Sequence, residues 1–283
     1  MATRNVGTGQ TYTTLNAAIA DITANGDNIV IKNSGTFTLS QYCAYAFNLT
    51  CDYTDNPDNF PVINQSDCNY YNMFNAGDTT WSKLIIVSTI GLYLGQGNNV
   101  NLFRRCVFRD GSGTFLLKMS SNQGLDQFEN CIFENIGQTN FIENISYPSW
   151  PDARFYNCTF HNVDSFMDDD LQTTELDKWI IKNCILSGTW TAPGNNLRSR
   201  VTYSLTTEAT TNYGTGCVSN SDPKYKKASP DVPSDFQIQS TSPAKGIGNS
   251  TDAPTVDIAN NARSGAWDAG AWIASTTRRI MII

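Results

Sequence analysis

Short apolar runs recur along the middle of the chain at a nearly constant interval. Cys106, Cys131, Cys158 and Cys184 lie 25, 27 and 26 residues apart. Each has a large apolar residue at two fixed offsets. Three residues before each cysteine is Phe103, Phe128, Phe155 or Ile181, and two residues after it is Phe108, Phe133, Phe160 or Leu186. Four consecutive units with three matching columns indicate a structural repeat.

The composition of each unit identifies the kind of repeat. A leucine-rich repeat has a similar period, but its L-x-x-L-x-L signature is missing and no unit contains a helical apolar stripe. Each unit instead has short β-rich runs separated by Asn, Gly, Asp and Ser. Three short strands and three turns fill such a unit. One unit cannot bury its apolar side alone, but stacked units can. The sequence therefore predicts an all-β, right-handed parallel β-helix with coils of about 25–27 residues.

The position before each cysteine explains the geometry of the coil. Residues three before and two after the cysteine are both apolar, so the inward alternation must break between them. A bend at the preceding residue produces this break, and Asn tolerates bends well. We expect a buried cysteine stack and an asparagine ladder, although chance placement in an Asn-rich chain is the alternative reading of the ladder. The preceding residues are Arg105, Asn130, Asn157 and Asn183.

The two ends of the chain differ from the repeats. We expect a strand and a short capping helix within residues 1–28. The helix would begin at Thr13 or Thr14, and its apolar face would consist of Leu15, Ala18, Ile19 and Ile22. Residues 29–220 form the coils, and 221–283 form a C-terminal capping segment and tail. We expect one domain overall.

Composition narrows the classes of function. Hydrophobic residues make up 40 % of the chain, charged residues 16 %, and the net charge is −7. This balance argues against a nucleic-acid partner, and no run is long enough to predict a membrane span. The start of the chain, Met1–Gly7, has no apolar stretch typical of a secretory signal. The absence of a C-x-x-C pair argues against a thiolate zinc site, and we predict no metal and no cofactor. The spacing of the coils would allow disulfides within the cysteine column, but we expect reduced thiols packed as small apolar groups, as in a protein assembled in a cytoplasm. Whether Cys43, Cys51, Cys68 and Cys217 pair stays open.

One outward column carries the most suggestive chemistry. Three residues after each cysteine is Arg109, Glu134, His161 or Ser187, and His161 is the only histidine. An acid, a base and a hydroxyl on neighbouring strands are candidates for a hydrolytic site. The alternative, which we favour, is a solvent-facing ladder of mixed charges.

Two further groups are weaker candidates. Asp168, Asp169 and Asp170, with Glu175 and Asp177, are an acidic cluster that could bind Ca²⁺ or supply a glycosidase carboxylate pair. A solvated loop is the simpler interpretation. The aromatic residues could stack on sugars, but packing of loops on the coils is the commoner role. They are Tyr70, Tyr71, Trp81, Tyr147, Trp150 and Trp190.

Both ends of the chain resemble a known superfamily. The run from Val6 to Ile19 is similar to the opening of pectate-lyase-like β-helix proteins, including phage tailspike and particle proteins. Ser242–Gly248, Asp257–Arg263 and Trp267–Trp272 resemble the closing S-P-A-x-x-x-G, D-x-x-G-x-x-R and D-x-G-A-x-E motifs. Asn261–Ala262 and Trp272 depart from those motifs. The resemblance implies the fold more specifically than any activity.

The resemblance favours a structural phage virion protein, such as a capsid decoration or an accessory appendage subunit, located in the virion and assembled in the host cytoplasm. Its expected partners are other virion proteins and copies of itself, for example in a trimer. The opening of the β-helix begins by about Val6, so we expect no separate domain that attaches a spike to its particle. The apolar tip Ile280, Met281, Ile282 and Ile283 is a candidate docking element. The alternative is a tailspike-like polysaccharide depolymerase or a protein that binds a host surface glycan. A cellular carbohydrate enzyme would need an export signal. We therefore expect no enzymatic activity and no catalytic residues.

Overall fold

Parallel strands stacked one coil upon the next build the molecule, and this confirms the all-β parallel β-helix that the repeat predicts. All pairs between the named strands are parallel. The computed structural model describes residues 1–40, 43–65, 77–88, 92–94, 99–109, 117–119, 124–136, 142–144, 152–163, 179–190, 198–209 and 212–275.

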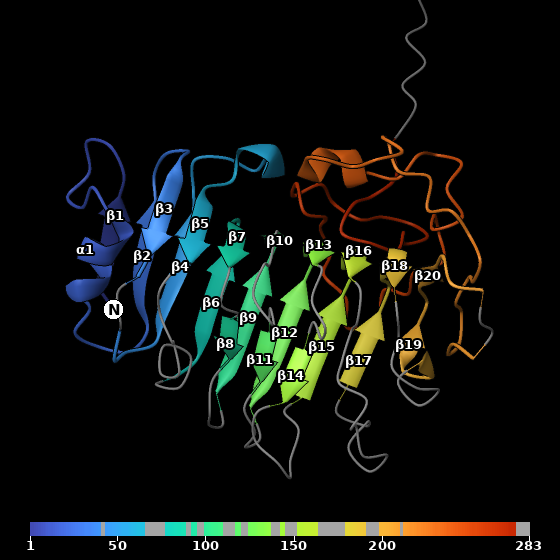
Figure 1. Cartoon of the computed structure of the whole chain (residues 1–283), viewed down its shortest axis with the longest axis horizontal. Helices are drawn as coiled ribbons and strands as arrows, with labels where there is room; N and C mark the ends of the chain where they lie inside the picture. Colours follow the sequence, from blue (N-terminus) through green and yellow to red (C-terminus); the bar gives the residue numbers. More distant parts are fainter. Residues whose placement is uncertain are drawn as a thin grey trace, which may run out of the picture.

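Two long sheets run side by side along the axis of the β-helix (Figure 1). Within the described residues, the first sheet has nine strands: β1 (Thr3–Val6), β2 (Asp27–Ile31), β4 (Phe47–Cys51), β6 (Thr79–Ser82), β9 (Val100–Arg104), β12 (Leu125–Glu129), β15 (Asp152–Tyr156), β17 (Trp179–Lys182) and β19 (Val201–Thr202). The second described sheet has eight: β3 (Thr36–Leu39), β5 (Val62–Gln65), β7 (Ile85–Ser88), β10 (Val107–Arg109), β13 (Ile132–Ile136), β16 (Thr159–Val163), β18 (Ile185–Trp190) and β20 (Leu205–Thr206). A short third sheet contains β8 (Leu92–Leu94), β11 (Leu117–Met119) and β14 (Ile142–Asn144).

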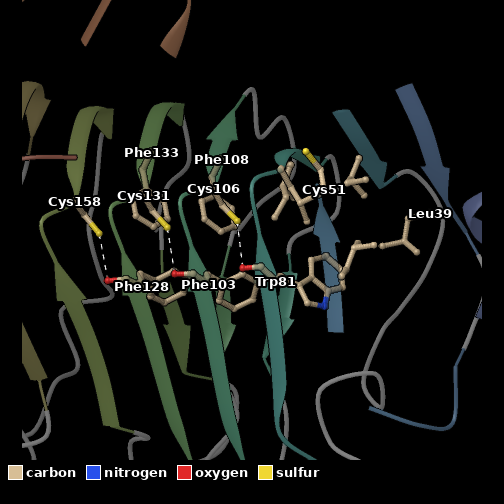
Figure 2. Close-up of a cluster of buried hydrophobic side chains, with 14 of the residues drawn as sticks. Leu39, Cys51, Trp81, Phe103, Cys106, Phe108, Phe128, Cys131, Phe133 and Cys158 are labelled. Carbon is tan, nitrogen blue, oxygen red and sulfur yellow. Dashed lines mark hydrogen bonds between the residues drawn. The ribbon is translucent and has the colours of Figure 1, made fainter. Parts of the chain in front are cut away.

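Phenylalanine rings stack from coil to coil inside the β-helix. The rings of Phe103 and Phe128 are 5.0 Å apart, and those of Phe108 and Phe133 are 4.7 Å apart, both pairs nearly parallel (Figure 2). The two columns meet edge to face, with Phe103 and Phe108 at 5.7 Å. Each fully buried ring contributes about 1.5–3 kcal/mol, so the repeat that marks the sequence also supplies much of the core.

The cysteine stack is confirmed as a buried inward column. Cys106, Cys131, Cys158 and Cys184 are fully buried, and each thiol donates to the carbonyl oxygen at the start of the bend in the preceding coil. Figure 2 shows three of these bonds, including Cys131 Sγ to Phe103 O at 3.5 Å. The described cysteines are free thiols, which include Cys43, Cys51 and Cys217.

The bend before each cysteine is also confirmed. Arg105, Asn130, Asn157 and Asn183 all have a positive φ, between 53° and 58°. This left-handed conformation breaks the alternation, so the cysteine and the residue two positions later both point inward. Asparagine adopts it more readily than most residues.

A helix covers the N-terminal end, as the sequence predicts. Helix α1 (Leu15–Ala20) begins after Thr14, whose side chain accepts a hydrogen bond from Ala17 N at 3.2 Å. Leu15, Ala18 and Ile19 are buried in the main core, while Ile22 lies just beyond the helix. The helix contacts β1 and β3 and therefore shields the first coil.

The C-terminal segment lies along the side of the β-helix. We call the described residues 221–275 the strap, since in Figure 1 they run back across the second sheet. Their apolar side chains form one cluster with outward residues of that sheet, among them Val107, Ile132 and Ile185. The short helix η3 (Pro233–Phe236) reaches η1 (Pro57–Asn59), where Ser234 N donates to Asp58 Oδ1 at 2.7 Å. The segment thus covers a flank, whereas the sequence suggested a cap at the end.

Candidate functional site

The candidate catalytic residues stack in one outward column, as the sequence predicts. Strands β10, β13, β16 and β18 place Arg109, Glu134, His161 and Ser187 in register. Arg109 Nε forms an ion pair with Glu134 Oε1, and His161 Nδ1 lies 3.0 Å from Ser187 Oγ. The sequence therefore correctly predicts which side chains the stacking brings together.

The strap covers this column. Ser187 Oγ is 2.7 Å from the Tyr225 hydroxyl, and the His161 ring packs edge to face against Tyr225 and Phe236, at 5.8 and 5.4 Å. Arg109 Nη2 donates to Asp231 O at 3.3 Å. Strap residues thus contact the column at Arg109, His161 and Ser187.

Burial changes what the column can do chemically. Glu134 is 1 % exposed and Ser187 is 2 % exposed, so the expectation of a solvent-facing ladder is wrong for these two residues. Burial lowers the pKa of His161 and raises the pKa of Tyr225. The imidazole is thus neutral near pH 7 and hydrogen-bonded to a hydroxyl that no large substrate can reach. In this conformation the column fastens the strap to the sheet.

Arg263 and Asp257, from the closing motifs of the sequence, also hold the strap in place. The guanidinium of Arg263 is buried and donates to oxygens of the strap and to Asn130 Oδ1, the last at 3.1 Å. Burial lowers the pKa of Arg263 to about 10. Asp257 is fully buried and accepts from backbone amides, including Asn261 N at 2.8 Å. These motif residues are structural, since each closes the strap on itself or on the β-helix.

The asparagine ladder is only partly a ladder. Asn183 Nδ2 donates to Asn157 Oδ1 at 3.3 Å, which is the expected bond between coils. Asn157 Nδ2 donates to Asp268 O at 3.2 Å, and Asn183 Nδ2 also donates to Asn249 O at 2.7 Å. The expected bond between coils is present for this pair, and the strap provides further partners that the sequence did not predict.

Two cavities lie beside the strap, and the sequence analysis identified neither. One, of about 460 Å³, lies between a corner of the coils and the strap loop 252–256, and includes Arg104, Glu129 and Asp252 in its lining. Arg104 Nε is 2.8 Å from Glu129 Oε2. The other, of about 440 Å³, lies within the strap and includes Lys245, Arg263, Trp267 and Asp268. Arg263, Trp267 and Asp268 of the second cavity belong to the closing motifs of the sequence, so those motifs could have pointed to it.

Several predicted residues lie outside this picture. Asp168, Asp169 and Asp170 and the tip Ile280–Ile283 fall outside the described residues. The same holds for Tyr70, Tyr71, Tyr147 and Trp150, and for the side chain of Trp190. Trp81, a candidate for sugar stacking, is fully buried in the core beside Phe47 and Phe103, so that interpretation is wrong.

Among the described residues, no three or more His, Cys, Asp or Glu side chains are grouped so as to hold a metal ion. In the same part of the chain no helix is long and apolar enough to cross a membrane. Comparison with known protein families finds no family that matches the chain, and no curated protein matches it either. The fold therefore defines the class, a protein with a parallel β-helix and a strap on its flank.

Proposed function

We propose that the chain is a non-enzymatic structural protein of a phage particle, such as a capsid decoration or an accessory appendage subunit. The observation that carries the proposal is the burial of Glu134 and Ser187, the latter against Tyr225 of the strap. Of the side chains best suited to hydrolysis, Glu134 is held in an ion pair with Arg109, and His161 and Ser187 pack against the strap. The stacked core favours a building block.

The assignment to a phage particle rests on the resemblance of both chain ends to phage β-helix proteins. In support, the resembling residues have defined roles in this structure. Thr14 caps the first helix, Ser242 Oγ donates to Pro223 O at 2.6 Å, and Arg263 bonds the strap to Asn130. Residues that resemble the superfamily are thus those that close the two ends of the chain on the β-helix.

The apolar tip provides the test of particle attachment. Replacing Ile280, Met281, Ile282 and Ile283 by serine should leave the thermal unfolding midpoint unchanged and lower the copy number per purified particle, measured by quantitative mass spectrometry. Burying three such side chains in a partner supplies about 1.5–3 kcal/mol each before ordering costs. The matched control is Thr276→Ala with Thr277→Ala. Equal occupancy of both variants, or absence of the intact chain from particles, contradicts the proposal.

A second candidate, a polysaccharide depolymerase or glycan-binding β-helix, is favoured by the cavity that Glu129 and Asp252 line. A pair of carboxylates at one site is the minimum for glycoside hydrolysis. This candidate requires that the intact protein release reducing ends from a host polysaccharide and that Glu129→Gln abolish the release. The control Glu134→Gln tests the column beneath the strap separately.

A further inference from the structure

Aliphatic side chains also point outward on the first sheet, outside the cluster that the strap forms with the second. Strands β9 and β12 lie side by side in the middle of the first sheet (Figure 1) and present Val100, Leu102 and Leu125 on its outer face. We call these three residues the aliphatic patch. Val100 is 38 % exposed, and Leu102 and Leu125 are half-exposed. Neither hydrophobic cluster of the described residues includes any of the three.

The second sheet shows how this chain covers outward aliphatic residues elsewhere. Val107, Ile132 and Ile185 point outward there, and each is at most 1 % exposed because apolar residues of the strap pack against them. Removing such surface from water is favourable. The aliphatic patch has no cover of this kind within the described chain, and contiguous exposed apolar surface marks interaction sites in soluble proteins.

Opposite charges lie on adjacent strands beside the patch. Arg104 follows Leu102 on the outer face of β9, and Glu129 is its partner in register on β12. Arg104 Nε lies 2.8 Å from Glu129 Oε2, and the arginine side chain remains 51 % exposed. A guanidinium has five N–H donors, so Arg104 can bind a second carboxylate while it keeps the first. A face with both charges on neighbouring strands is complementary to a copy of itself.

We infer that the aliphatic patch binds a second copy of this chain, face to face, about a two-fold axis that runs along the strands between β9 and β12. This axis exchanges the two strands, so Val100 packs on the partner's Leu125 and Arg104 meets the partner's Glu129. Each contact occurs twice, as in any two-fold interface. The two arginines and two glutamates then alternate in sign, and this charge complementarity favours a second copy over an unrelated protein.

The other edge of the patch is compatible with the same axis. Asp152, in register with Leu125, is brought towards the partner's Asp78. Arg154 lies 3.6 Å from Asp152 in the same chain and offsets the repulsion. Because the patch is small, we expect a weak dimer with a Kd of about 10–100 µM. The inference goes beyond the proposed structural role and does not depend on it.

Sedimentation velocity of the intact chain, from about 1 to 200 µM, tests the inference. We expect the mass of one chain at the lowest concentration and of two chains at the highest. Val100→Asp and Leu102→Asp should each raise the dimer Kd at least about tenfold, because they place a charge in an apolar contact. Neither side chain is buried, so the thermal unfolding midpoint should stay that of the parent.

The matched control is Val30→Asp, the same change at a half-exposed outward position of β2 in the same sheet. This variant should dimerise as the parent does. The mass of one chain at every concentration, or a mass of three chains, would overturn the inference. An equal loss of dimer in Val30→Asp and Val100→Asp would overturn the location.

A charge exchange tests the orientation of the two copies. Arg104→Glu places like charges opposite one another and should raise the dimer Kd at least about tenfold. Adding Glu129→Arg restores opposite charges within and between the chains, so the double variant should return to within about threefold of the parent Kd. A double variant that unfolds at the parent midpoint but stays as weak as Arg104→Glu would overturn the two-fold arrangement.

Discussion

At the residue scale, one backbone conformation accounts for two features of the molecule. The left-handed residue before each cysteine, an asparagine in three of the four coils and Arg105 in the other, turns the chain, and its side chain bonds to the strap. Asn157 combines a φ of 53° with complete burial and bonds to Asn183 and to the Asp268 carbonyl. The same residue therefore positions the inward column and anchors a segment more than a hundred positions away.

Asn157→Ala should lower the free energy of unfolding by about 2–4 kcal/mol, because the left-handed backbone is strained by Ala and the buried partners lose their bonds. Urea denaturation measures the change. Asn220→Ala is the control, since Asn220 has the same φ of 53° but is exposed. If both variants lose the same free energy, the side-chain bonds contribute nothing.

A buried carboxyl provides a second test at this scale. Asp126 is buried in the first sheet and accepts from Asn101 Nδ2 at 2.8 Å, and desolvation raises its pKa to about 7. An unfolded aspartate ionises near pH 4. Between about pH 4 and pH 7 the unfolded state therefore loses the proton first, and the contribution of Asp126 to stability falls as pH rises.

Asp126→Asn should remove this loss, which is about 4 kcal/mol at most for three pH units. The variant gains stability relative to the parent between pH 4 and pH 8, as denaturation at each pH would show. Asp152→Asn, at a half-exposed aspartate on the next strand, is the control. A constant difference between Asp126→Asn and the parent over this range contradicts the buried ionisation.

At the element scale, the sequence was most informative where the period is regular. The columns at Cys106, Cys131, Cys158 and Cys184 repeat within one residue of 26, so they could be aligned by inspection. The column continues to Ser204 and Cys217, because Ile185 pairs with Leu205 and Leu205 with Val218. Those steps are only 20 and 13 residues, and the shorter coils hid the continuation from the sequence.

The strap is the element that sequence could not place. Its described residues have short bridges and turns in place of long strands, so no apolar period marks which face is buried. Its contacts join positions far apart, such as Arg263 to Asn130 and Arg105 Nε to Ile258 O. Without Tyr225 of the strap, Ser187 would face solvent, and this is why the expected environment of the column was wrong there.

Gly270 marks the closest approach of the strap to the sheet. Its φ is +92°, and a Cβ there would lie 2.6 Å from Ile185 Cδ1. Gly270→Ala should therefore loosen the strap and cost about 1–3 kcal/mol more than Gly265→Ala. Gly265 has a φ of +68° with open space around it, so this control isolates the clash from the backbone strain.

Hydrogen exchange of residues 221–275 measures the effect of Gly270→Ala and of its control, Gly265→Ala. Gly270→Ala should increase exchange in the strap while the amides of β12 and β15 remain protected. Equal protection of the strap in both glycine variants would show that the close approach at Gly270 does not hold it.

At the scale of the whole molecule, the β-helix is closed at one end by α1 and along one flank by the strap. The first sheet carries the longest ladder, and the second is covered by apolar residues of the strap. This closure is what the proposed structural role rests on. The two cavities beside the strap lie where it meets itself or the coils, so both depend on the strap being in place.

The central claim is that the strap seals the outward column, and the accessibility of Ser187 tests it most directly. In the variant Ser187→Cys, a nearly isosteric change, we expect the new thiol in the native protein to react with a maleimide as slowly as the buried Cys131. Ser82→Cys, on the outer face of the first sheet and half-exposed, is the control and should react quickly. Peptide mapping by mass spectrometry resolves each site. Rapid labelling at position 187 in the folded chain would contradict the account, because the column would then face solvent.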